Sequence, residues 1–248
     1  MKEITKDGKH YYYFNVDENK LNYSQRDNQY RWSHVDAKVT ASTTCNVTSI
    51  AMGLNYAGFN FPPGKFDQPE DNLADSILKS ELVDKEYARR YPAMYKEYKE
   101  GLKDAYTPNE IHKLIEIGTN EWMGRNVDTF HEDYPIVSII SQIVNKCSPV
   151  VASGRFPKAN GGVLNHIICI VGVAFSDEEY NNHKDDLTAA TPSYWIVDDP
   201  WGYTGKYEES TDGNDVFISN ENFIAWFKPV NNTSVKYAHV FEKPVATV

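Results

Sequence analysis

The chain has 248 residues, with 35 acidic side chains, 25 basic ones and a formal net charge of −10. An acidic excess argues against a nucleic-acid-binding protein, which normally presents a basic surface to phosphates. The 41% hydrophobic and 24% charged residues are typical of a globular protein with a buried core. No apolar run approaches the ~20 residues of a membrane-spanning helix, and the first residues lack the apolar centre of a signal peptide. We therefore expect a soluble protein, with a cytoplasmic location fitting best; a phage-encoded protein or a specialised-secretion effector would look the same.

The first elements in chain order are a strand and a helix. HYYYFNV, residues 10–16, is β-prone, and a turn-rich segment follows it. TTCNVTSIAMGLNYAGF, residues 43–59, predicts one helix, with Thr43 or Thr44 as its cap and Gly58 as its left-handed end. Its apolar side chains recur at helical spacing and predict a core-facing side, formed by Val47, Ile50, Ala51 and Leu54.

The middle of the chain, about residues 59–146, predicts a mainly helical insert. Residues 59–72 hold three prolines and one glycine, which predict a loop. The helical pattern runs from about 73 to 123, with a division at Pro92 and a capping box from Thr107 to Glu110. One more helix is predicted over residues 135–146.

The remainder of the chain is β-rich. Four segments are rich in β-branched and aromatic residues and are bounded by turn residues: 148–156, 166–176, 193–200 and 234–243. A short helix is predicted at about 220–227. A helical first half followed by a β-sheet predicts an α+β fold, and we expect residues 1–248 to form a single domain with two lobes.

The three cysteines differ in their surroundings. Cys45 lies at the start of the predicted helix, where unpaired N–H groups and the helix dipole stabilise a thiolate. A buried structural cysteine would also fit this position. Cys147 and Cys169 are expected to be small structural core residues. An odd, sparse set of cysteines is not a disulfide framework.

A nucleophilic thiolate needs a base, and His166 is the candidate. It opens the apolar strand HIICIVGVAF, whereas the other six histidines lie in polar or helical surroundings and are expected at the surface. The segment YWIVDDPWG ends a buried-looking strand in two carboxylates. Asp198 and Asp199 must point to opposite faces of an extended strand, so only one of them can face His166. A simple turn would also explain these residues.

These segments together resemble papain-like cysteine peptidases, and more narrowly the branch of the bacteriocin-processing (double-glycine) peptidases. TTCNVTSIAMGLNYAGF is similar to the family's cysteine helix, NHIICIVGVAF to its histidine strand and YWIVDDPWG to its aspartate strand. LNYSQRDNQYRW resembles the segment before the cysteine, where a glutamine supplies an oxyanion donor. The resemblance touches four short segments within residues 21–202 and assigns nothing to 59–146.

The resemblance implies a papain-like fold whose cysteine helix packs on an antiparallel sheet. It also implies Cys45 as nucleophile, His166 as general base and acid, Asp199 as the residue that orients the imidazole, and Gln25 as a donor of the oxyanion hole. Two departures stand out. Asn46 occupies a position where the family usually has glycine, and Asp198 one where asparagine is more common, which leaves the orienting role open to Asp198.

The expected reaction is thiol-dependent hydrolysis of a peptide or isopeptide bond through a thioester. Glutamine deamidation, transglutamination and peptidoglycan amidase chemistry use the same triad, and a catalytically silent peptide-binding module is a further alternative. A metal-dependent hydrolase is less favoured. His112 and Glu116 share a helical face and residues 131–133 are polar, but no HExxH or CxxC pattern accompanies them. We expect no cofactor or metal and a peptide or protein substrate; the oligomeric state is not predicted.

Overall fold

The computed structural model describes residues 1–17, 22–25, 27–28, 44–102, 104–157, 163–202, 213–228 and 236–243. These residues form an α+β fold in which helices pack on both faces of a twisted antiparallel sheet. The helices are α1 (Cys45–Tyr56), α2 (Pro69–Lys79), α3 (Glu81–Arg90), α4 (Pro92–Lys99), α5 (His112–Trp122), α6 (Ile136–Val144), α7 (Asp177–His183) and α8 (Asn220–Trp226), with short 3-10 helices η2 (Pro108–Glu110) and η3 (Leu187–Ala189).

Within the described residues the sheet has eight strands. They are β1 (Lys2–Lys6), β2 (Lys9–Asn15), β3 (Asp128–Glu132), β4 (Val150–Pro157), β5 (Val163–Ser176), β6 (Tyr194–Asp198), β7 (Val216–Ser219) and β8 (Tyr237–Phe241). Their order is β1-β2-β5-β4-β8-β3, with β6 paired to β5 and β7 paired to β6. The long strand β5 is therefore the centre of the sheet, and its start carries His166.

Strand alternation in β5 divides the core into two layers. Ile168 and Ile170 pack with the isoleucines of α6, whereas Cys169 and Val171 pack with α1 on the other face. Burial of these side chains is the main favourable contribution to folding. The sheet thereby fixes where α1 and its cysteine lie.

Helix α1 lies unusually close to strand β8. Its Gly53 faces the ring of Phe241, and a Cβ atom built on this glycine would lie 2.2 Å from the ring carbon Cε2. Only a residue without a side chain permits such an approach. Gly58, at the end of the helix, has the positive φ of 91° that the sequence predicts for its C-terminus.

The helical part of the insert is confirmed with one shift of boundary. Pro92 starts α4 and divides the helices, and the capping box of Thr107 and Glu110 is present at η2. The expected loop of residues 59–72 is too long, because α2 already begins at Pro69, where proline suits the first helical turn. Ser80 adds a break that the pattern did not predict: it ends α2, and its side chain caps α3.

The insert is not wholly helical. Residues 128–132 form β3, which pairs antiparallel with β8 at the edge of the sheet. Tertiary pairing with a strand more than one hundred residues away, rather than local propensity, gives this segment its conformation. The hairpin of β1 and β2 likewise joins the sheet from the start of the chain, through the pairing of β2 with β5.

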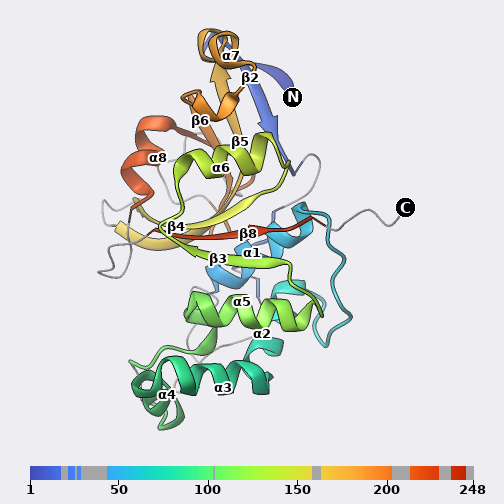
Figure 1. Ribbon diagram of the computed structural model, residues 1–248, viewed down its shortest axis with the longest axis vertical. Coiled ribbons are helices and arrows are strands. Elements are labelled where there is room, and N and C mark those ends of the chain that lie inside the picture. The colour runs from blue at the N-terminus through green and yellow to red at the C-terminus, as the bar shows by residue number, and fades with distance from the viewer. Residues whose placement is uncertain are drawn as a thin grey trace.

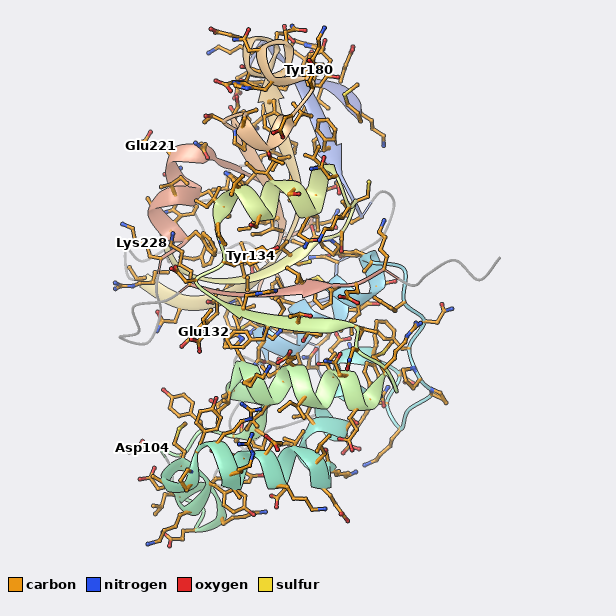
Figure 2. The ribbon with its side chains drawn as sticks, in the orientation of Figure 1. Asp104, Glu132, Tyr134, Tyr180, Glu221 and Lys228 are labelled. Carbon is orange, nitrogen blue, oxygen red and sulfur yellow. The ribbon has the colours of Figure 1, made fainter. Side chains whose placement is uncertain are left out.

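Figure 1 shows α2, α3, α4 and α5 gathered at one end of the molecule, with α7 and β2 at the other. Figure 2 shows Tyr180 at the α7 end, where its ring stacks on that of Tyr12 with centroids 3.8 Å apart. Among the described residues, no helix has the length and apolar character needed to cross a membrane.

Candidate active site

Cys45 is the first residue of α1, and its side chain is partly exposed. Cys45 therefore lies at the end of the helix that has unpaired N–H groups and the positive end of the helix dipole. Thr44 occupies the cap position, but its hydroxyl does not cap the helix and instead hydrogen-bonds the Asn28 amide at 2.9 Å. The expected side-chain cap at Thr44 is therefore wrong, and Thr43 lies outside the described residues.

His166 lies near the start of β5 and is 3% exposed. It pairs with Gly154 of β4, and the ring of Phe156 meets its imidazole edge-to-face. Nε2 of His166 lies 2.6 Å from Oδ1 of Asp199. The carboxylate thus holds one nitrogen of a buried imidazole and leaves Nδ1 for another partner.

The turn that follows β6 holds Asp199. Its Oδ1 also accepts a hydrogen bond from the Trp201 N–H at 2.9 Å. Its backbone N–H donates to the Gly213 carbonyl oxygen at 2.8 Å, which ties the turn to the start of the β7 segment. A Cβ atom on Gly213 would lie 2.3 Å from the Asp199 carbonyl oxygen, so this close contact requires glycine.

The thiol of Cys45 is the other partner of the imidazole. Burial opposes the charged form of His166, but the charge and hydrogen bond of Asp199, followed by those of Cys45, raise its pKa to about 10. The ring is therefore held as an imidazolium at neutral pH, between a carboxylate and a thiol.

Asp198 points away from this group. Its Oδ2 accepts a hydrogen bond from the Tyr56 hydroxyl at 2.7 Å, and its Oδ1 accepts one from the Asp215 N–H at 2.8 Å. The two neighbouring aspartates therefore lie on opposite faces, as expected, and the one that contacts His166 is Asp199.

Gln25 is 1% exposed, and its backbone N–H donates to the Pro200 carbonyl oxygen at 2.8 Å. This bond ties the segment before the cysteine to the turn of Asp199. Most of the rest of that segment, residues 26 and 29–43, lies outside the described residues.

The two other cysteines differ from each other. Cys169 is fully buried in β5, and this burial raises the pKa of its thiol well above the ordinary value. Cys147, expected in the core, is exposed and has a positive φ of 46°. The expectation is wrong because α6 ends before this residue and the chain turns at the surface to enter β4.

A second buried histidine, His239, is one of the six that the sequence patterns place at the surface. His239 of β8 is 1% exposed, and its Nδ1 lies 2.9 Å from Oδ2 of the buried Asp128. Its Nε2 lies 2.9 Å from Nδ1 of His112. Two of the six histidines expected at the surface thus belong to an internal hydrogen-bonded chain. The signal was present in the sequence, since the strand YAHVF places a histidine among apolar residues.

The suggested metal pair of His112 and Glu116 does not form. His112 turns to His239, whereas Glu116 makes an ion pair with Lys113. Among the described residues, the group with the spacing of metal ligands is instead formed by Asp17, Asp198 and Asp215.

The chain matches a known family over most of its length. The model of the Peptidase_C39 like family matches residues 20–228. This range contains the cysteine helix, the histidine strand, the aspartate turn and the helical insert. No curated protein matches the chain. Since most of the sequence fits the family model, the chain belongs to the peptidase C39-like family and has its papain-like α+β fold and cysteine-peptidase-like character.

Proposed function

We propose that the protein is a thiol hydrolase that cleaves a peptide or isopeptide bond, with Cys45 as nucleophile. The observation that carries this proposal is the buried His166–Asp199 pair, with its nitrogen and oxygen 2.6 Å apart, beside a partly exposed thiol at a helix start. Only the thiol of the three groups is open to solvent, which is what a nucleophile needs when its base and orienting carboxylate are shielded.

The thiolate of Cys45 attacks the carbonyl carbon of the scissile bond, and the electron pair of the C=O bond moves to oxygen. The Cys45 N–H and the Gln25 side chain donate hydrogen bonds to this oxyanion. When the tetrahedral intermediate collapses, the C–N bond breaks and the His166 imidazolium gives its proton to the leaving amine. A thioester on Cys45 and a neutral His166 remain.

Deacylation reverses these roles. Neutral His166 takes a proton from water, the resulting hydroxide attacks the thioester carbonyl, and the Cys45 thiolate leaves as the acid product departs. Asp199 stabilises the imidazolium that is present before acylation and that forms again during deacylation. Its two hydrogen bonds, from His166 and from the Trp201 N–H, hold it in the required position.

The nature of the acyl acceptor decides between hydrolysis and its relatives. Water gives peptide cleavage or glutamine deamidation, whereas an amine gives transfer. Mass spectrometry of products from a peptide library containing glutamine and an added primary amine separates these outcomes: chain cleavage supports the proposal, and only deamidated or amine-linked products would replace it.

The nucleophile assignment is tested with Cys45→Ala. We expect the variant to lose at least ~10⁴-fold of the peptide-cleaving activity, as triad enzymes do without their nucleophile, and to keep its circular dichroism spectrum. Cys147→Ala is the matched control, because it removes an exposed thiol away from the site. A folded Cys45→Ala variant with full activity would refute the mechanism.

A further inference from the structure

Three carboxylates converge where three strands of the sheet end. Asp17 follows β2, Asp198 ends β6, and Asp215 directly precedes β7. Because β5 pairs with both β2 and β6, and β6 pairs with β7, these ends meet at one place. One carboxylate oxygen of each residue lies within 4.8 Å of the corresponding oxygens of the other two.

Asp17 gives this cluster an unsatisfied acceptor. The residue is 2% exposed, and its Oδ1 is buried without a hydrogen-bond partner. The side chain points into the cluster, since one of its carboxylate oxygens lies within 4.8 Å of an oxygen of Asp198 and of one of Asp215. A buried carboxylate oxygen that accepts nothing is costly, and a bound cation is one of the few partners that satisfies it.

The neighbours of the cluster hold the oxygens in place. Asn15 accepts a hydrogen bond from the Asp17 N–H at 2.9 Å and donates one to Oδ1 of Asp215 at 2.7 Å. Tyr56 donates to Oδ2 of Asp198 at 2.7 Å. These hydrogen bonds hold the three carboxyl groups in fixed positions relative to one another.

The spacing suits a calcium ion. Oxygen ligands lie about 2.3–2.6 Å from Ca²⁺, so two ligands on opposite sides of the ion are about 4.6–5.2 Å apart. The three aspartate oxygens, within 4.8 Å of one another, fit around one such ion. Magnesium dehydrates reluctantly and keeps several waters, which suits a site built from residues as buried as Asp17 and Asp198 less well.

We propose that Asp17, Asp198 and Asp215 bind a calcium ion that joins the ends of β2, β6 and β7. The ion would steady the peptide between Asp198 and Asp199, and with it the turn that faces His166. The proposal concerns metal binding and stability, so it stands or falls independently of the proposed hydrolase activity.

The experiment uses the full chain after treatment with EDTA and dialysis. Addition of CaCl₂ at about one hundred times its dissociation constant is expected to raise the melting temperature by about 5 °C. Terbium binding, read as emission on excitation of tyrosine, should be displaced by Ca²⁺, because Tyr56 contacts a ligand. MgCl₂ at the same concentration should give a smaller shift in melting temperature.

Asp215→Asn and Asp133→Asn form a matched pair. Both residues have positive φ, 52° and 56°, where asparagine is well tolerated, but Asp133 lies outside the cluster. We expect Asp215→Asn to weaken terbium binding ~10-fold or more and Asp133→Asn to leave it unchanged; Asp17→Asn provides the same test if Asp215→Asn fails to fold. The proposal is refuted if Ca²⁺ does not raise the melting temperature, or if the cluster variants bind terbium as the parent does.

Discussion

The described residues include two buried histidine–aspartate pairs. His166 and Asp199 are 3% and 0% exposed, and His239 and Asp128 are 1% and 2% exposed. Nitrogen and oxygen lie 2.6 Å apart in the first pair and 2.9 Å in the second. By burial and hydrogen bonding alone the pairs are almost equivalent.

The two pairs differ in the group that lies on the other side of the imidazole from the aspartate. The second ring nitrogen of His239 meets His112, whose own pKa is held well below its ordinary value by burial and by the neighbouring imidazole. His166 instead has a thiol beside it, at the solvent-facing start of a helix. A buried His–Asp pair is therefore not by itself evidence of catalysis; the partly exposed thiol next to His166 is what distinguishes the two pairs.

Among variants of the two pairs, we expect the largest change in the reactivity of Cys45 from matched His→Gln substitutions at His166 and His239. His166→Gln should slow alkylation of Cys45 by iodoacetamide at pH 6 about 100-fold, because an ordinary thiol of pKa about 8.5 is scarcely ionised there. His239→Gln should change the rate less than about 2-fold, since its neighbour is an imidazole. Peptide mapping by mass spectrometry gives the rate at each cysteine, with the exposed Cys147 as internal reference. If alkylation of Cys45 slows equally in both variants, the two pairs do not differ in their effect on the thiol.

The second prediction concerns the pH dependence of stability. The pKa of His166 is raised to about 10 in the folded protein, against about 6.5 in an unfolded chain. The stabilisation by Asp199 is thus fully present below pH ~6.5 and is lost as the pH rises through about 10. The gap in unfolding free energy between the parent and Asp199→Asn should shrink by about 2 kcal/mol or more between pH 6 and pH 10.

Urea unfolding at each pH measures this gap. The control repeats the Asp199→Asn change in a His166→Gln background, where the imidazole beside Asp199 is absent. The difference in unfolding free energy that Asp199→Asn causes should not follow the same pH course there. If the difference in unfolding free energy between the parent and Asp199→Asn stays constant from pH 6 to pH 10, Asp199 does not hold an imidazolium.

The smallest expected effect is on the rate of thiol labelling in Asp→Asn variants. Asp199→Asn should slow alkylation of Cys45 at pH 6 about 10-fold, because the imidazolium loses its carboxylate but keeps its place beside the thiol. Asp128→Asn should leave the Cys45 rate unchanged while lowering stability by about 1–3 kcal/mol through the weakened bond to His239. A rate in Asp128→Asn as low as in Asp199→Asn would mean that both pairs act on the thiol.

Local signals allowed much of this structure to be predicted. The helix that starts at Cys45 was found from apolar spacing and from Gly58, and α6 from its row of isoleucines. The two-residue period of a strand is enough to place Ile168 and Cys169 of β5 on opposite faces, where the structure has them. Each of these rules depends on residues that are neighbours along the chain.

The features that local patterns do not predict depend on how distant parts of the chain pack together. Strand β3 forms because β8 pairs with it, and His239 is buried because Asp128 lies on that paired strand. Cys147 is exposed because the chain turns at the surface between α6 and β4. None of these contacts is visible in local spacing, because their partners lie far away in sequence or are set by how the elements pack.

Local sequence patterns therefore specify which chemical groups are present and which elements carry them: a thiol at a helix start, a histidine opening a strand, and two aspartates before a proline. The contact of Asp199 with His166, and the position of Asp198 beside Asp17 and Asp215, depend instead on how the strands assemble into the sheet. The reason is physical. Alternation forces neighbouring strand residues to opposite faces, but the sheet order alone fixes what each face meets.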